Sequence, residues 1–184
     1  KDTRTLNLLI AILECSYSNP THPLTSKFVG GQGTLLMFPA ELRIIAFNCR
    51  SLRSFLRSSY ASSFMKDPAD ILVLTEVQSS FEKLASLPAV ATLIKSYGYC
   101  FWNAASEPND TYAGTAILCR ARPDSVLYGF HASVGVDLQG SLITVRYKDC
   151  TLVGVYCPAL PKDNKAFMQK LNQHVAIEQC TQQT

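Results

Sequence analysis

The sequence predicts an α/β sandwich, and three features lead to this prediction. The segments Leu42–Asn48 and Asp70–Glu76 are apolar on both alternating faces, which is typical of strands that are covered on both sides. A stretch with helical periodicity follows each of them. Several short apolar segments and a last helical stretch come afterwards. This order of elements is that of stacked sheets with helices outside.

Size and composition fit one folded domain. The chain has 184 residues, of which 47% are apolar and 17% are charged, and this balance excludes general disorder. No apolar run reaches the ~18 residues that span a bilayer, so we expect no membrane partner. The net charge of +3 permits a polyanionic partner without requiring one.

The seven cysteines are scattered and include no Cys-x-x-Cys pair. Most lie in apolar stretches, so we expect free thiols that are buried as small apolar side chains. This usage is typical of a reducing intracellular compartment. It does not distinguish nucleus, cytoplasm or organelle.

Residues 1–40 are predicted to be an N-terminal extension or linker ahead of a domain that spans residues 41–184. Leu6–Leu13 is apolar and follows the basic residues Lys1 and Arg4, and we interpret it as a buried or partner-facing helix. Residues 16–34 are rich in Ser, Thr, Pro and Gly, which predicts a loop or linker.

Three helical stretches are predicted in the domain. The first is Arg50–Phe64, whose apolar side chains recur on one face. The second is Phe81–Ser96, in which Pro88 is expected to kink or break the helix. The third is Asn164–Glu178, and its His174 has no feature that marks it as a catalytic residue.

Four further strands are predicted from short apolar runs with turn residues between them. They are Ala113–Cys119, Ser125–Phe130, Ser141–Tyr147 and Thr151–Cys157. Lys148 and Asp149 separate the last two strands, which indicates a tight hairpin.

Two of the buried strands end in polar side chains. Asn48 closes the first strand and Glu76 closes the second. Ligands in α/β proteins bind outside the carboxyl ends of such strands, and an amide with a carboxylate suits a hard cation such as Mg²⁺. The alternative is that both side chains merely cap their strands.

Two other features have both a functional and a structural interpretation. Tyr156 closes an apolar strand, where its hydroxyl either binds a phosphate or occupies an amphipathic edge position. Arg50, Arg53 and Arg57 share one helix face, which is either a nucleic-acid-binding surface or an ordinary solvated face.

A series of segments resembles one known family in order along the chain. The segments are Arg43–Asn48 with Ser51–Arg53, Asp70–Glu76, Tyr97–Ala105, Tyr112–Leu118, Ser125–Gly129, Asp137–Val145 and Leu152–Pro158. Together they resemble the exonuclease III / AP endonuclease family, within the endonuclease/exonuclease/phosphatase superfamily. The resemblance covers roughly residues 41–178 and implies a four-layer α/β sandwich, of which we expect this chain to carry the first half.

The resemblance also implies an activity and a set of site residues. Members of the family cut phosphodiesters beside abasic sites in double-stranded DNA, with Mg²⁺ or with Mn²⁺ in its place. By the match, Asn48 and Glu76 would lie at the metal, and Tyr156 would be the catalytic residue that orients the scissile phosphate. DNA-binding residues would be Arg53, Arg57, Tyr112 and Gly114.

The sequence departs from the family pattern at important positions. Arg50 stands where the family has Asp or Asn, and a guanidinium disfavours a nearby cation. Thr75 replaces the Gln before the metal-binding Glu. The Gly-Asp-x-Asn motif, which carries the water-activating Asp, and the late Ser-Asp-His motif do not occur in the 184 residues.

Three functions therefore stay open. The first is an AP endonuclease that is weak or inactive as this chain alone. The second is a degenerate, non-catalytic relative that serves as a structural or nucleic-acid-binding subunit of a larger assembly. The third is another phosphodiesterase of the superfamily, such as a retroelement endonuclease. Because a half-domain leaves a sheet face uncovered, we also expect a protein partner on that face.

Overall fold

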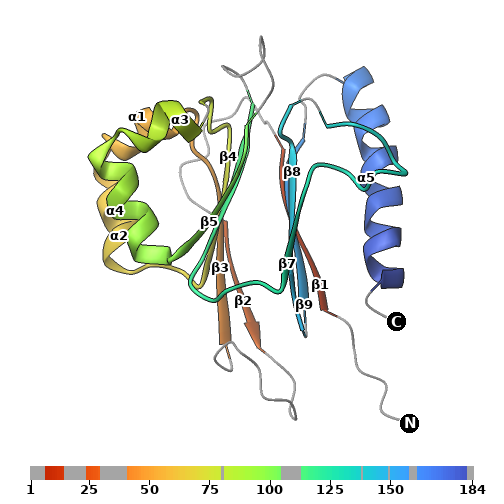
Figure 1. Ribbon diagram of the computed structural model, residues 1–184, viewed down its shortest axis with the longest axis horizontal. Helices are drawn as coiled ribbons and strands as arrows, with labels where there is room; N and C mark the ends of the chain where they lie inside the picture. Colours follow the sequence, from red (N-terminus) through yellow and green to blue (C-terminus); the bar gives the residue numbers. More distant parts are fainter. Residues whose placement is uncertain are drawn as a thin grey trace.

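The protein is a sandwich of two sheets that lie face to face. The computed structural model describes residues 7–14, 24–29, 41–79, 81–104, 113–137, 139–148, 150–157 and 161–181. Helices lie on both outer sides of the sheet pair, so the molecule has four layers (Figure 1). The predicted four-layer α/β sandwich is confirmed.

The first sheet has five strands in the order β2-β3-β4-β6-β5. Its central strands β3 and β4 are parallel, and the other neighbouring pairs are antiparallel. The bounds are β2 (Leu24–Val29), β3 (Glu41–Asn48), β4 (Ile71–Thr75), β5 (Tyr99–Asn103) and β6 (Thr115–Cys119).

The second sheet has four strands in the order β1-β9-β8-β7. β8 and β9 form the predicted antiparallel hairpin, and β1 lies parallel to β9. The bounds are β1 (Asn7–Glu14), β7 (Ser125–Tyr128), β8 (Leu142–Tyr147) and β9 (Cys150–Cys157).

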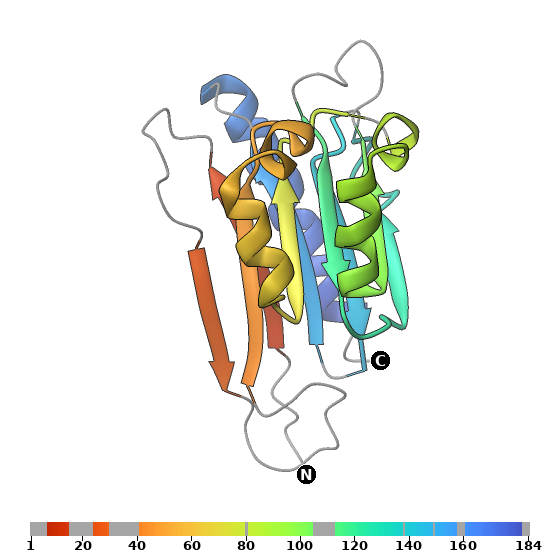
Figure 2. The same cartoon turned by 90° about the vertical axis from the view of Figure 1, so that its left-hand side faces the viewer.

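Helices cover the outer face of each sheet. Four short helices lie on the five-stranded sheet and face the viewer in Figure 2, whereas one long helix lies on the four-stranded sheet. The bounds are α1 (Leu52–Leu56), α2 (Ser59–Lys66), α3 (Phe81–Ala85), α4 (Pro88–Tyr97) and α5 (Pro161–Thr181). No helix among these described residues is long and apolar enough to cross a membrane.

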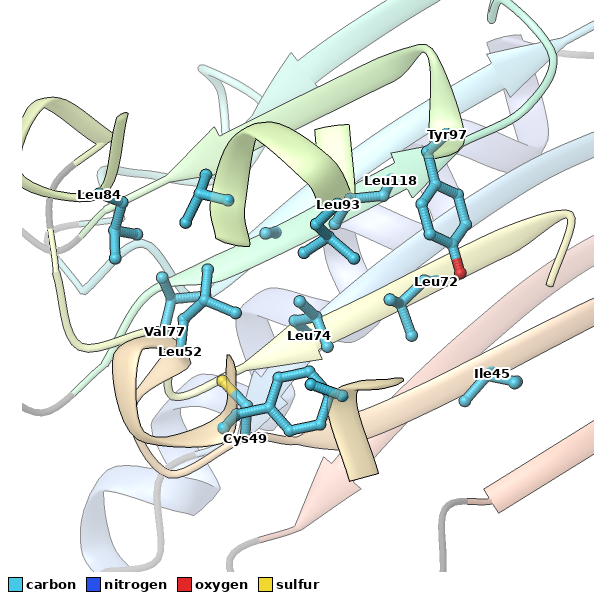
Figure 3. Close-up of a cluster of buried hydrophobic side chains, with 14 of the residues drawn as sticks. Ile45, Cys49, Leu52, Leu72, Leu74, Val77, Leu84, Leu93, Tyr97 and Leu118 are labelled. Atoms are coloured by element: carbon cyan, nitrogen blue, oxygen red, sulfur yellow. The ribbon is translucent and has the colours of Figure 1, made fainter. Parts of the chain in front are cut away.

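The buried apolar side chains form three layers. One layer, shown in Figure 3, packs α1 to α4 against the five-stranded sheet and includes Leu52, Leu74 and Leu93. A second layer fills the space between the sheets, and a third lies under α5. The strands β4 and β6 are buried along their whole lengths, which explains their continuous apolar runs.

The structure differs from the sequence predictions in four places. Leu6–Leu13 was predicted as a helix and is mostly strand β1, because a short apolar run fits either structure. The predicted loop 16–34 contains strand β2. Arg50–Phe64 forms two helices that are separated at Arg57 and Ser58. Strand β5 was not predicted.

The expected protein partner depended on a sheet face without cover. In the described part of the chain each sheet packs one face on the other sheet, and helices lie on its outer face. Strand β1 also adds to the edge of β9. The uncovered sheet face, which was the reason to expect a partner, is therefore not found among the described residues.

Two polar contacts hold α5 on the four-stranded sheet. The Arg146 guanidinium donates two hydrogen bonds of 2.7 Å to the Glu178 carboxylate, which is completely buried. His174 is also buried in α5. Its Nδ1 accepts the backbone N–H of His131 at 3.1 Å, so the neutral ring carries its proton on Nε2, 2.9 Å from the Thr144 hydroxyl.

Removing the charge of Arg146 and removing that of Glu178 should lower the free energy of unfolding by different amounts. Arg146→Met leaves the buried Glu178 carboxylate without its partner and should lower the free energy of unfolding by about 3–5 kcal/mol. Glu178→Gln removes the buried charge and should cost clearly less. Urea denaturation of the two variants measures the difference, and equal losses would contradict this account.

The buried imidazole should make stability depend on pH. Burial lowers the pKa of His174 below its usual value of 6.5, while Glu178 opposes this shift and Arg146 and His131 add to it. The unfolded chain therefore takes up a proton first, so acidification from pH 6.5 down to the folded pKa should reduce stability. Well above pH 6.5, where the ring is neutral in both states, this group should add no pH dependence to the stability.

The control for this pH dependence is His174→Gln. Urea midpoints between pH 5 and pH 8 should fall less steeply on the acid side in this variant than in the parent protein. Identical slopes in the two proteins would show that His174 is not the titrating group.

Candidate active site

Asn48 and Glu76 meet at one edge of the sandwich, where strands β3 and β4 end; Figure 2 shows these strand ends at its top. Asn48 pairs in register with Thr75 across the parallel strands β3 and β4, so both strands end together. The Asn48 Nδ2 group donates a hydrogen bond of 2.9 Å to Glu76 Oε1, and its Oδ1 accepts the backbone N–H of Arg50. The predicted proximity is confirmed; the role of both residues at a metal stays a prediction.

The loops after β3 and β4 have unusual backbone conformations. Arg50, Ser51, Glu76 and Gln78 have φ values between 46° and 89°, a region that residues other than glycine rarely adopt. Hydrogen bonds between the loops hold them there, since the Ser51 and Leu52 N–H groups donate to Glu76 and Val77 carbonyls at 2.8 and 3.1 Å. Strained backbone of this kind gathers at functional sites.

Cys49 fastens the two loops from the core side. Its thiol donates to the carbonyl oxygens of Thr75 and Glu76, at 3.1 and 3.3 Å. Burial raises the pKa of Cys49 to about 12, and the nearby Glu76 charge adds to this rise. Because a thiol needs to ionise to act as a nucleophile, Cys49 is a structural hydrogen-bond donor.

A row of polar side chains crosses the five-stranded sheet at this edge. Asn48, Thr75, Thr115 and Asn103 stand in register on β3, β4, β6 and β5. Alternation along the strands places all four on the face toward the other sheet, one step beyond the apolar residues Ala46, Val73, Ile117 and Phe101. The apolar layer between the sheets therefore ends in a polar border.

Two hydroxyl groups in this row are buried and form no hydrogen bond with the described residues. Thr75 Oγ1 and Thr115 Oγ1 have no hydrogen-bond partner among the described residues, although both side chains are almost fully buried. A buried hydroxyl without a partner lowers stability, so the polar row carries an energetic cost.

Tyr156 faces the polar row from the other sheet. Gly154, two residues earlier on β9, approaches Val73 and Ile117, so alternation turns Tyr156 toward the five-stranded sheet as well. Its backbone N–H donates to the Ser141 carbonyl at 2.7 Å. The structure thus brings Tyr156 to the same edge as Glu76.

The expected DNA-binding residues have different outcomes. Gly114 lies at the edge, where its N–H donates to Gln139 and its carbonyl accepts from Val77. Arg53 and Arg57 are exposed on α1 and directly after it. Tyr112 lies outside the described residues.

The donor set at the edge suits a hydrated Mg²⁺ ion. Mg²⁺ is often bound by one or two carboxylates while it keeps several waters, and Glu76 with Asn48 supplies one carboxylate and one amide. The described residues contain no cluster of three or more His, Cys, Asp or Glu side chains. The exposed Arg50 comes two residues after Asn48 in the sequence, and its positive charge opposes the binding of a cation there.

Comparison with known proteins assigns the chain to a family. The sequence profile of the endonuclease/exonuclease/phosphatase family matches residues 45–179. The chain belongs to this family. It is 33% identical over 142 residues to the DNA repair nuclease APEX1 of Danio rerio and 26% identical over 123 residues to a DNA-(apurinic or apyrimidinic site) endonuclease of Dictyostelium discoideum. These matches cover 77% and 64% of the chain.

Solved structures of the family have the same fold. A 3′ phosphatase from Neisseria, bound to a product DNA hairpin, matches with a TM-score of 0.58, 27% identity and 74% of this chain covered. An AP endonuclease from Archaeoglobus fulgidus matches with a TM-score of 0.53 at 20% identity and 72% coverage. The chain spans 42% and 30% of the two relatives above, and 52% and 48% of these two structures.

Sequence reasoning missed several polar residues at this edge. Gln78 Nε2 lies 3.5 Å from Glu76 Oε2, and Asp137 accepts hydrogen bonds in the turn before β8. Thr75 and Thr115 complete the polar row. The apolar-to-polar change at the end of β4 and the start of β6 was a signal for the two threonines, but Gln78 and Asp137 had none.

Replacing a buried threonine with valine should stabilise this family member. Thr75→Val or Thr115→Val removes a hydroxyl that has no hydrogen-bond partner in the described part of the chain and keeps the shape of the side chain. The free energy of unfolding should therefore rise by about 1 kcal/mol and Tm by about 2–4 °C. Thermal denaturation measures this change. Thr92→Val on the exposed face of α4 is the control and should have little effect; a loss of stability at Thr75 and Thr115 would show that their hydroxyls have partners.

Proposed function

We propose that the protein is a Mg²⁺-dependent phosphodiesterase that acts on DNA at abasic sites, as an AP endonuclease does. The observation that carries this proposal is the hydrogen-bonded pair of Asn48 and Glu76, with Tyr156 at the same edge on the opposing sheet. Family membership and the AP endonuclease among the relatives support the substrate class.

The residues of the edge would share the work as follows. Glu76 and Asn48 would hold Mg²⁺ or Mn²⁺, which supplies charge neutralisation on phosphoryl oxygens. Tyr156 would donate a hydrogen bond from its hydroxyl group to a phosphate oxygen and so orient the phosphate. Asn48 would keep the Glu76 carboxylate in place through their hydrogen bond. Arg53 and Arg57 would contact the DNA backbone.

Water activation is the step for which this chain has no candidate residue in its sequence. The family's Gly-Asp-x-Asn motif is absent from the 184 residues. Loss of a general base costs about 10²–10⁴-fold in rate, and Arg50 weakens cation binding further. We therefore expect weak cleavage. The free cysteines of the described residues fit a reducing intracellular location, which we propose for this activity.

Incision of a duplex that contains one abasic site tests the proposal. The parent chain should give slow cleavage that requires Mg²⁺ and stops with a chelator. Glu76→Gln should abolish the cleavage, because the amide still accepts the Asn48 hydrogen bond but carries no negative charge for the metal. Asp124→Asn, an exposed carboxylate at the opposite edge, is the control and should cleave like the parent.

A second function is supported by Arg50 and the missing motif. It is a non-catalytic DNA-binding relative, to which the exposed Arg50, Arg53 and Arg57 would contribute positive charge. The predicted common helix face is wrong for these arginines, because only Arg53 lies within α1; Arg50 precedes the helix and Arg57 follows it. Salt-dependent binding of the duplex without any incision, weakened by Arg53→Gln and Arg57→Gln, would favour this function. Chelator-sensitive incision that is lost in Glu76→Gln would contradict it.

A further inference from the structure

The Asp137 carboxylate organises the turn that precedes β8. Its Oδ2 accepts the backbone N–H groups of Ser141 and Leu142 at 2.7 and 3.1 Å, and its Oδ1 accepts that of Gln139 at 3.2 Å. The Asn103 amide donates to Oδ2 at 3.3 Å. Four donors thus converge on one side chain, and both carboxylate oxygens are used.

This turn is fastened to both sheets. The Ser141 carbonyl accepts the Tyr156 N–H at 2.7 Å, on the four-stranded sheet. The Gln139 carbonyl accepts the Gly114 N–H at 3.1 Å, and Gly114 in turn accepts the N–H of Val77, the residue after Glu76. One carboxylate therefore supports two chains of hydrogen bonds, which end at Tyr156 and beside Glu76.

The turn also lies directly on the end of β5. At Gly140, which has a φ of 61°, an added Cβ atom would come within 2.3 Å of the Asn103 carbonyl oxygen. Asn103 itself donates to the Leu142 carbonyl at 2.8 Å as well as to Asp137. The contact with β5 stops the turn from shifting toward the five-stranded sheet, and the hydrogen bonds to Asp137 hold the turn on that contact.

We propose that Asp137 is a positioning residue that sets how Tyr156 on one sheet lies relative to Glu76 on the other. It fixes the Gln139 and Ser141 carbonyls, and these hold Gly114 and Tyr156. The functional meaning of this spacing rests on the proposed function, in which Tyr156 and Glu76 act on one phosphate. The spacing itself is a property of the hydrogen bonds.

The charge of Asp137 is costly, which argues for a specific use. Burial raises the pKa of Asp137, although the N–H groups of Gln139, Ser141 and Leu142 oppose the shift. An asparagine would avoid the buried charge. However, it has one acceptor oxygen, so its NH₂ group would face an N–H donor where the carboxylate now accepts.

The two variants at this position should therefore differ. In Asp137→Asn the amide oxygen can keep the hydrogen bonds from Ser141, Leu142 and Asn103 at the Oδ2 position, and the NH₂ group then meets the Gln139 N–H. The hydrogen bond from the Gly114 N–H to the Gln139 carbonyl (the Gly114 arm) should weaken, while the one from the Tyr156 N–H to the Ser141 carbonyl (the Tyr156 arm) remains. Asp137→Ala removes every acceptor and should loosen both arms.

Backbone amide hydrogen exchange, measured by NMR on the full chain, tests this proposal. The Gly114 and Tyr156 amides are themselves the donors in the two arms. In Asp137→Asn the Gly114 amide should exchange about tenfold faster and the Tyr156 amide about as in the parent; in Asp137→Ala both should exchange faster. Asp124→Asn is the matched charge control and should change neither.

Two results would overturn the proposal. One is unchanged exchange at both amides in Asp137→Asn, which decides the matter even if Asp137→Ala fails to fold. The other is equal acceleration at every amide of the sheets, which would indicate a general loss of stability.

If the parent protein cuts abasic DNA, Asp137→Asn should also lower kcat at least tenfold with KM within about twofold. If the parent does not cut, the proposed function fails, and the exchange pattern still decides the role of Asp137.

Discussion

The close approach of the two sheets at Gly154 is the constraint on which the site depends. A side-chain carbon there would come within 2.8 Å of Ile117 Cδ1 and 3.0 Å of Val73 Cγ1, so only a glycine fits without displacement. Because interiors are close-packed, this contact fixes β9 against β4 and β6. Two residues further along β9, Tyr156 therefore lies over the ends of the same strands.

Each sheet then contributes a different part of the site. The five-stranded sheet supplies Asn48 and Glu76 from parallel neighbours, and the loops behind them are locked by backbone hydrogen bonds in strained conformations. The four-stranded sheet supplies Tyr156. The turn around Asp137 joins the two contributions, so the site belongs to the assembled sandwich and to neither sheet alone.

The sequence predicted the architecture and the Asn48–Glu76 pair because both follow from local patterns. A strand covered on both faces has a continuous apolar run, and the polar residue that ends it has a defined place at the sheet edge. β1 was missed because its six consecutive apolar residues, Leu8–Leu13, have no period that separates strand from helix. Asp137 was missed because its partners come from a turn and from Asn103, whose approach only the packed sheets determine.

Strand β1 has a consequence for how the chain reaches its final structure. It pairs with β9 from Asn7 beside Cys150 to Glu14 beside Cys157, the most distant pairing along the sequence in the two described sheets. During synthesis β1 leaves the ribosome long before its partner strand β9. An apolar strand without its neighbour is prone to aggregation during that interval, and the long closure makes its pairing a late and slow event. Its exposure before β9 is made gives chaperones an apolar segment to bind.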